Sequence, residues 1–161
     1  MSHSEVRIRP ALPAESAEVA RIMRTAFADH RGRIRPESAA LKETAQSVAR
    51  LIAEGRVFVA DCEGRLAGCV SAAPEGEHVY LGRLSVLPEF RRRGIANRLL
   101  EAAEDYARET GLGAVLLKVR VALPENQAFF RARGYREIGR EAHPGFDHPT
   151  SIRMEKRLSA R

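Results

Sequence analysis

The chain has 161 residues, of which 44% are hydrophobic and 30% charged, a composition typical of globular proteins. No apolar run approaches the roughly 20 residues that cross a bilayer, and residues 1–5 lack the apolar stretch of a secretory signal. We therefore expect a cytoplasmic protein without a membrane partner. The net charge of +6 suggests attraction to anions. A solvated basic surface, a nucleic-acid surface and a pocket for a phosphate-rich cofactor are all open on this evidence.

The cysteine and histidine content argues against metal and disulfide chemistry. The two cysteines, Cys62 and Cys69, lie in apolar, strand-like stretches and are too few for a disulfide framework. The five histidines are scattered, with no pair at the spacing of a zinc site. We expect no metal.

The first third of the chain predicts a strand and two helices. Without a repeat, low-complexity tract or long polar linker, residues 1–161 are expected to form one domain. A strand is predicted at residues 6–9, and apolar residues at helical spacing predict a helix at residues 19–27. A second helix is expected to have Pro36 in its first turn and to end at Gly55.

The remaining elements predict a mixed α/β fold. Three strands of an antiparallel meander are expected at residues 57–60, 66–73 and 79–86. An amphipathic helix then runs from Ile95 to a glycine stop at Gly111. The strand after it, at residues 114–119, is expected to lie parallel to the strand before it. The chain closes with a short helix at residues 124–133 and strands near residues 135–140 and 151–156.

The turn before the helix at Ile95 has the character of a phosphate site. A helix start leaves backbone N–H groups unpaired and carries partial positive charge. Gly94 and Ala96 would let a phosphate approach the backbone, and Arg91, Arg92 and Arg93 add cationic donors. No P-loop or Rossmann glycine motif is present. Taken alone, the short pattern is a weak signal, and a solvated basic turn is the stronger interpretation.

In its context, the Arg91-x-x-Gly94-x-Ala96 pattern resembles the acetyl-CoA signature of the GNAT superfamily of N-acyltransferases, Gln/Arg-x-x-Gly-x-Gly/Ala. The order of the predicted elements matches that family over most of the chain, and residues 123–135 and 154–158 are similar to its later segments. The resemblance implies a single GNAT-like α/β (α+β) domain. Its central sheet would be mixed and mostly antiparallel, with a parallel, splayed strand pair and about four flanking helices.

The resemblance also implies a reaction, in which an acetyl group moves from acetyl-CoA to a primary amine by direct attack in a ternary complex. The amine could belong to a small molecule, an amino acid or a peptide N-terminus. A backbone N–H of Leu84 or Val86 would polarise the thioester carbonyl. The residues that would contact the cofactor are Leu84, Ser85, Val86, Arg91, Arg92, Arg93, Gly94, Ile95, Ala96, Asn97, Asn126 and Phe130.

The chain departs from the family pattern in two places. Relatives often carry a carboxylate or histidine where this chain has Tyr80 and Gly82, which alternation predicts on one face with Leu84. Tyr80 is the candidate catalytic side chain, with a half-buried strand aromatic as the alternative; residues 77–78 would act only through water. Phe130 replaces a tyrosine that can protonate the leaving thiolate. Because a thiol has an ordinary pKa near ~8.5, the thiolate can leave with little help.

The acceptor and two rival functions stay open. Arg31, Arg33 and Arg35 would suit an acceptor bearing a carboxylate or phosphate, Asp147 would suit a cationic amine, and both sets could be solvated loop residues. The rivals are an acyl-CoA-binding sensor without turnover and a basic nucleic-acid-binding module. Scarce aromatic residues, at 6%, argue against the second. Family habit suggests a homodimer.

Overall fold

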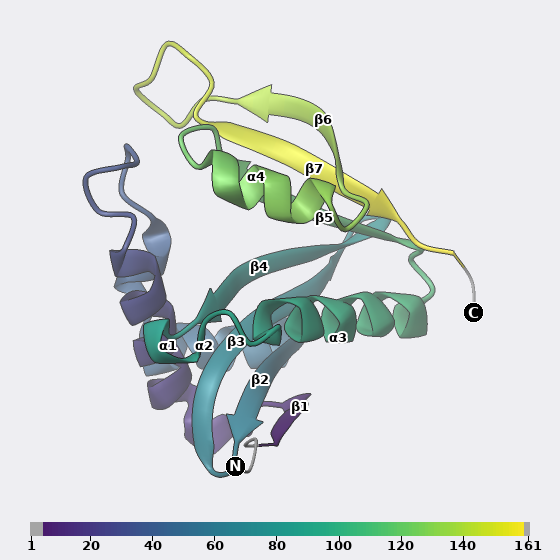
Figure 1. The fold of residues 1–161 in the computed structure, drawn as a ribbon. Coiled ribbons are helices and arrows are strands. Elements are labelled where there is room, and N and C mark those ends of the chain that lie inside the picture. Colours follow the sequence, from purple (N-terminus) through teal and green to yellow (C-terminus); the bar gives the residue numbers. More distant parts are fainter. Residues whose placement is uncertain (1–4, 160–161) are drawn as a thin grey trace.

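Seven strands form one sheet in the computed structural model, which describes residues 5–159 (Figure 1). Their order across the sheet is β1-β2-β3-β4-β5-β7-β6, and every neighbouring pair is antiparallel except β4 with β5. The bounds are β1 Val6–Pro10, β2 Arg56–Cys62, β3 Arg65–Glu75, β4 His78–Val86, β5 Ala114–Arg120, β6 Arg136–Glu141 and β7 Ser151–Arg157. The predicted mixed sheet with one parallel pair is confirmed. Residues 1–4, on which most of the signal-peptide argument rests, lie outside the described residues.

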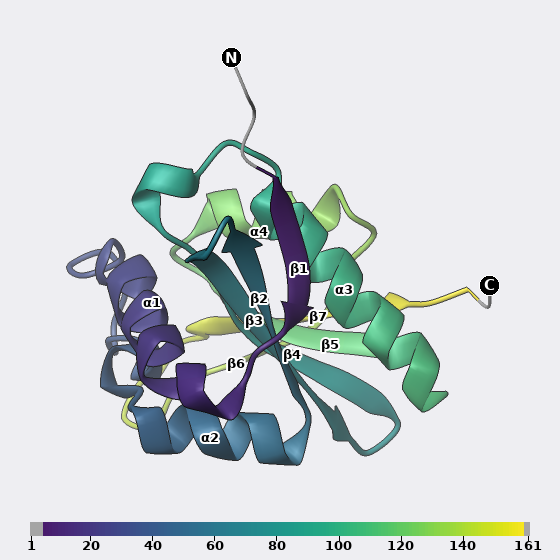
Figure 2. The same cartoon turned by 90° about the horizontal axis from the view of Figure 1, so that it is seen from below.

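Helices cover both faces of this sheet. Helices α1 and α2 lie together on one face, and α3 crosses the other (Figures 1 and 2). The bounds are α1 Ser16–Ala28, α2 Ala45–Glu54, α3 Ile95–Thr110 and α4 Pro124–Arg131. The predicted apolar stripe of α1 is fully buried at Val19, Ile22 and Met23. Within the described residues, no helix is long and apolar enough to span a membrane.

The start of the second helix differs from the prediction. Pro36 lies in an irregular segment, followed by a short 3-10 helix, η2, at Ala39–Lys42. Helix α2 begins only after Thr44, whose hydroxyl accepts a hydrogen bond from the Ser47 backbone N–H at 3.1 Å. The Ser47 hydroxyl accepts in turn from the Thr44 N–H at 2.8 Å. This reciprocal cap satisfies two N–H groups of the helix start, which Pro36 cannot do.

The parallel strands β4 and β5 are joined at one end and separate at the other. They pair through Val79 with Val115 and Tyr80 with Leu116, after which β4 continues to Val86 without β5 beside it. Figure 1 shows the two halves of the sheet diverging from this junction. The splayed pair that the resemblance implied is therefore present, and it opens toward the N-terminal end of α3.

A buried ionic cluster ties the second half of the sheet to α3. Glu104 of α3 is 5% exposed and accepts a hydrogen bond from the Tyr135 hydroxyl at 2.8 Å. The Lys156 ammonium on β7 lies 3.1 Å from the same carboxylate. Burial and the Glu104 charge raise the pKa of Tyr135, so its phenol stays neutral and keeps donating.

This cluster gives a stability prediction. The substitution Glu104→Gln leaves the half-buried Lys156 without its counter-ion, so we expect the free energy of unfolding to fall by about 3 kcal/mol. Glu109→Gln, at an exposed position near the end of the same helix, should change it by less than about 0.5 kcal/mol. Urea unfolding of both variants measures the difference, and equal losses would show that the cluster contributes nothing specific.

Candidate active site

A cleft of about 1070 Å³ opens where β4 and β5 separate. Residues 80–86 of β4 form one wall and residues 117–120 of β5 the other. Helices α1 and α4 also contribute lining side chains, and the cleft reaches the N-terminal end of α3. The cleft therefore joins the splayed strands to the turn that the sequence singled out.

The N-terminal end of α3 is open to a ligand. Gly94 is the residue before the helix and has a left-handed φ of 75°, and no side chain of the described residues caps the helix there. The N–H groups of Ile95, Ala96 and Asn97 thus lack the hydrogen bonds that a helix interior provides. A side-chain carbon built onto Gly94 would meet no described atom within 4 Å. These donors and the helix dipole together form a site that fits a phosphate group.

The arginines of the turn take different positions. Arg91 donates from Nε to the Val86 carbonyl at 3.2 Å and pairs with Asp29, the residue after α1, so it links the turn to two walls of the cleft. Arg92 lines the cleft in a left-handed conformation, with φ of 66°. Arg93 lies outside the lining, with its guanidinium 5.3 Å from the Phe90 ring centroid. The other described residues predicted to contact the cofactor all line the cleft.

A fourth arginine near this end was not predicted. Arg133 donates from Nε to the Asn97 side-chain oxygen at 2.7 Å, and its guanidinium stacks 3.7 Å from the Phe129 ring centroid. It also lines the cleft. Arg133 follows Phe129 by four residues, and this spacing in the sequence could have predicted their stacking. The contact of Arg133 with α3 depends on the tertiary fold. The cation held beside Asn97 adds positive charge next to the open helix terminus.

A β-bulge in β4 interrupts the alternation of side chains that the sequence analysis predicted for this strand. Gly82 lies opposite Ser71 and Ser85 lies opposite Cys69, so β4 carries one more residue than β3 between these pairs. The extra residue bends the strand at Arg83, which has a left-handed φ of 57°. Tyr80 and Gly82 therefore share a face with Ser85, and the prediction that they share it with Leu84 is wrong. Strict alternation fails because a bulge shifts the register by one residue.

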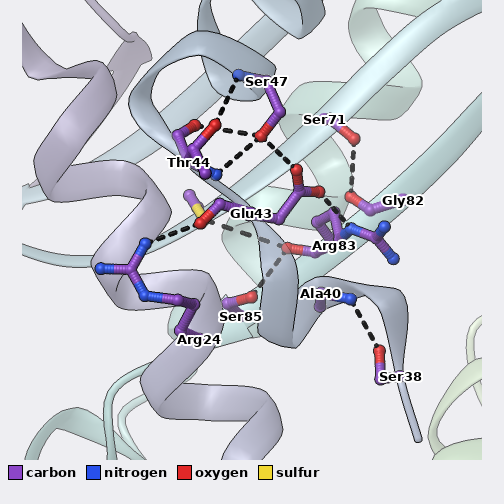
Figure 3. A network of polar contacts seen from close by, with 11 residues as sticks. Arg24, Ser38, Ala40, Glu43, Thr44, Ser47, Ser71, Gly82, Arg83 and Ser85 are labelled. Carbon is purple, nitrogen blue, oxygen red and sulfur yellow. Dashed lines mark hydrogen bonds and ion pairs between the residues drawn. The ribbon is translucent and has the colours of Figure 1, made fainter.

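A polar network holds this bulge in place (Figure 3). The buried Glu43, just before α2, accepts from Arg83 Nε at 2.6 Å and from the Ser47 hydroxyl at 2.6 Å. The Arg83 carbonyl in turn accepts from the Ser85 hydroxyl at 2.9 Å. The Ser71 hydroxyl donates to the Gly82 carbonyl at 3.0 Å. The network fixes the shape of β4 in the wall of the cleft.

One backbone donor of β4 points into the opening. The Leu87 N–H donates to the Ala67 carbonyl on β3 at 2.9 Å. Because successive N–H groups of a strand point to opposite edges, the Val86 N–H points away from β3, toward the edge from which β5 has separated. It is therefore free to donate to a ligand that lies between the strands.

A second group of polar side chains lines the β5 side of the cleft. Sequence reasoning missed Lys118, Arg120 and His143, which come from β5 and the segment between β6 and β7. These residues come together through the pairing of strands that are far apart in the sequence, so no local sequence pattern predicts their proximity. Of the arginines predicted near the acceptor, only Arg33 lines the cleft, with its guanidinium 2.7 Å from the Glu125 carboxylate.

Other predicted acceptor residues lie away from the cleft lining. Arg31 and Arg35 are exposed in their loop, and the side chain of Asp147 is fully exposed and paired with His148. His78 of the predicted residues 77–78 faces Glu75 at the β3–β4 hairpin, at 3.1 Å. These residues therefore do not join the cleft in this structure.

Burial shifts the acid–base properties of the cleft. It raises the pKa of Tyr80, with the nearby Lys118 and Arg83 opposing the rise, so the phenol stays protonated at neutral pH. Burial also lowers the pKa of His30, with the Arg33 charge adding to the effect. The pKa of His143 is lowered by burial and by Arg120, so both imidazoles are neutral at pH 7.

Comparison of the chain with known proteins identifies its family. A model of the acetyltransferase (GNAT) family matches residues 19–135, well over half of the chain. The chain belongs to the GNAT family. An IAA acetyltransferase of Azospirillum brasilense is 38% identical over 105 residues, covering 64% of this chain and 68% of that protein. An uncharacterized N-acetyltransferase of Chlorobaculum tepidum is 34% identical over 109 residues, covering 67% of this chain and 66% of that protein.

Solved structures share the GNAT fold along nearly the whole chain. The PaiA N-acetyltransferase of Thermoplasma acidophilum, in complex with coenzyme A, superposes with a TM-score of 0.80 at 18% identity, covering 96% of this chain and 99% of that one. YncA of Salmonella typhimurium, with acetyl-CoA, gives 0.74 at 20% identity, covering 98% and 96%. At these identities the likeness establishes the fold.

Helix α4 of this GNAT chain has a phenylalanine, Phe130, at the position where the family resemblance implies an acid. Phe130, at which the resemblance implied a departure from a tyrosine, is buried and lies edge-on to Phe129 and Tyr135, with ring centroids 5.1 and 5.6 Å away. The only hydroxyl in this aromatic group belongs to Tyr135, and it is engaged with Glu104. Among these three rings, none therefore offers a free proton to the cleft.

The network at the bulge yields a prediction on coupling. A double-mutant cycle with Glu43→Gln and Arg83→Gln should give a coupling energy of about 2 kcal/mol, because the carboxylate is buried and the two groups share one network. The Arg33 and Glu125 pair has a similar distance but is half exposed, and should couple by less than about 1 kcal/mol. Urea unfolding gives both values; equal coupling would contradict the anchoring role of Glu43.

Proposed function

We propose that the chain transfers an acetyl group from acetyl-CoA to a primary amine, by direct attack of the amine on the thioester in a ternary complex. The observation that carries the proposal is the cleft between β4 and β5, which ends at the open N-terminus of α3. Membership of the GNAT family and the CoA and acetyl-CoA complexes of its structural neighbours support the same donor. The proposal treats residues 1–161 as one N-acetyltransferase domain.

The donor would lie along β4 and reach the turn before α3. The backbone of Leu84, Ser85 and Val86 would pair with the amides of the pantetheine arm. The N–H groups of residues 94–97 and the guanidinium of Arg92 would hold the pyrophosphate. Asn126 and Phe130 line the opposite side and would contact the same arm.

The Val86 N–H would stabilise the charge that develops on the thioester oxygen. Attack by the amine forms the C–N bond and places negative charge on that oxygen, and collapse of the intermediate breaks the C–S bond. A fixed backbone donor at the oxygen contributes ~3–4 kcal/mol to catalysis in measured cases. Because Phe130 has no proton to give, the thiolate would leave unassisted by α4, as its ordinary pKa near ~8.5 permits.

The other functions have less support. The basic turn lies at the end of a cleft, which favours a small ligand with phosphates over an extended nucleic acid. An acyl-CoA sensor would bind the donor equally well, and release of free thiol with an amine panel separates it from an enzyme. The cytoplasmic location and the homodimer stay predictions.

The donor site is tested first by binding. Calorimetric titration of acetyl-CoA should give a micromolar dissociation constant for the wild type. Gly94→Glu places an acidic side chain at the helix terminus, where it repels the pyrophosphate, and should weaken binding by roughly tenfold or more.

Gly111→Glu is the matched control for that titration. Gly111 ends the same helix, has a similar left-handed φ of 78°, and also has open space around its missing side chain. It should therefore carry the same backbone strain while keeping wild-type affinity. A wild type that is folded and does not bind acetyl-CoA would overturn the proposed function.

The role of Tyr80 can be read from a pH profile. Because burial raises its pKa, the phenol stays neutral from about pH 6 to about pH 9 and can donate a hydrogen bond without acting as the base. Tyr80→Phe should lower kcat/KM by roughly tenfold, and by the same factor throughout this range. Loss of an ionisation from the profile in the variant would assign Tyr80 a proton-transfer role instead.

A further inference from the structure

Arg120 is a cation in the cleft without a partner. It is the last residue of β5, half-buried, and its Nη1 atom is inaccessible to solvent and has no hydrogen-bond partner. Within residues 5–159, its side chain makes no hydrogen bond or ion pair, while its backbone carbonyl accepts from Gln127 at 3.0 Å. Burial lowers the pKa of Arg120, because the charged form has lost water and gained no carboxylate.

The neighbouring cations are neutralised. The Lys118 ammonium lies 2.8 Å from the Glu141 carboxylate, and Arg83 lies 2.6 Å from Glu43. Arg33 pairs with Glu125 at 2.7 Å. The charge of Arg120 is thus the one left uncompensated among these four cations that line the cleft. A half-buried cation with an inaccessible, unpaired Nη1 atom is unfavourable, which suits a counter-ion that arrives with a ligand.

Strand pairing places Arg120 on the face where Tyr80 lies. Tyr80 is opposite Leu116, and β5 pairs with β7 in a regular register, so Leu116, Lys118 and Arg120 alternate onto one face. The Coulombic influence of Lys118 on Tyr80 agrees with this arrangement. The cations proposed for the pyrophosphate lie elsewhere, at the start of α3. Arg120 is therefore placed to meet the acceptor.

We propose that the acceptor amine also carries a carboxylate and that Arg120 binds it. This assignment of the substrate class rests on the proposed acetyltransferase function. A guanidinium matches a planar carboxylate with two parallel hydrogen bonds. The single uncompensated charge favours a monoanion over a doubly charged phosphate. The neutral imidazole of His143, which is held by Thr150 through Nδ1, lines the same part of the cleft and can add a hydrogen bond.

The proposal is tested with matched acceptors. Small amino acids such as glycine, L-alanine, β-alanine and γ-aminobutyrate are compared with their carboxamides and with aminoalkyl phosphonates. Binding to CoA-loaded protein and steady-state acetylation are both measured. The wild type should prefer at least one acid over its amide by roughly tenfold or more in kcat/KM, mainly through KM, because only the acid forms a charge-assisted pair.

Two variants identify the residue responsible. Arg120→Met should reduce the preference for the acid to within about threefold while leaving the affinity for acetyl-CoA unchanged. Arg31→Met, at an exposed arginine outside the cleft lining, should behave as the wild type. Unchanged acetyl-CoA affinity would show that Arg120→Met is folded and that its donor site is intact.

The possible failures are distinct. A wild type that treats acids and amides alike, prefers the phosphonates, or binds and acetylates none of the panel overturns the carboxylate proposal, while acetyl-CoA binding still upholds the donor site. Loss of acetyl-CoA affinity in Arg120→Met would also overturn it, because Arg120 would then serve the donor. A wild type that does not bind acetyl-CoA refutes the proposed function itself.

Discussion

The separation of β4 from β5 is the constraint on which the rest of the site depends. Strands that pair at Val79 and Tyr80 and then diverge leave backbone donors such as the Val86 N–H without a neighbouring strand. Buried backbone groups require partners, so the opening favours a ligand that supplies amides or carbonyls of its own. The bulge at Arg83 increases the bend of β4, and Glu43 holds that bulge from outside the sheet. The cleft thus depends on an ion pair formed between a bent strand and the start of α2.

Charge is distributed unevenly around this opening. The overall charge of +6 says little by itself, since many of the cations near the cleft are paired with carboxylates from other elements. Positive charge without a carboxylate partner occurs at the helix start, beside Arg92, and on β5, at Arg120. These two places lie at different parts of one cleft. A donor rich in phosphates and an acceptor with a single negative charge would each meet a cation without competing for it.

Local patterns in the sequence predicted the elements and the phosphate turn, because helical spacing and glycine at a helix start act over a few residues. Alternation failed at Leu84, since the extra residue at Arg83 is visible only against β3. Pro36 has a local preference for a first helical turn, but the reciprocal cap of Thr44 and Ser47 starts α2 further along the chain. Arg120 and His143 could not be found because β5 and the β6–β7 segment meet only through long-range pairing. Local sequence patterns thus predicted the phosphate turn at one end of the cleft and missed the polar side chains on its β5 side.

The acid–base chemistry that the cleft can support is limited, because several of its titratable side chains are neutral at pH 7. Burial keeps Tyr80 protonated and keeps His30 and His143 uncharged, and the ring of Phe130 contributes no proton. Such a site is a poor place for a strong base, so the amine would have to lose its proton to solvent before it attacks. An acceptor anchored by its own carboxylate would then present the neutral, nucleophilic amine to the thioester. Orientation of this acceptor and the backbone donor of Val86 would then carry the rate, because the ring of Phe130 supplies no proton.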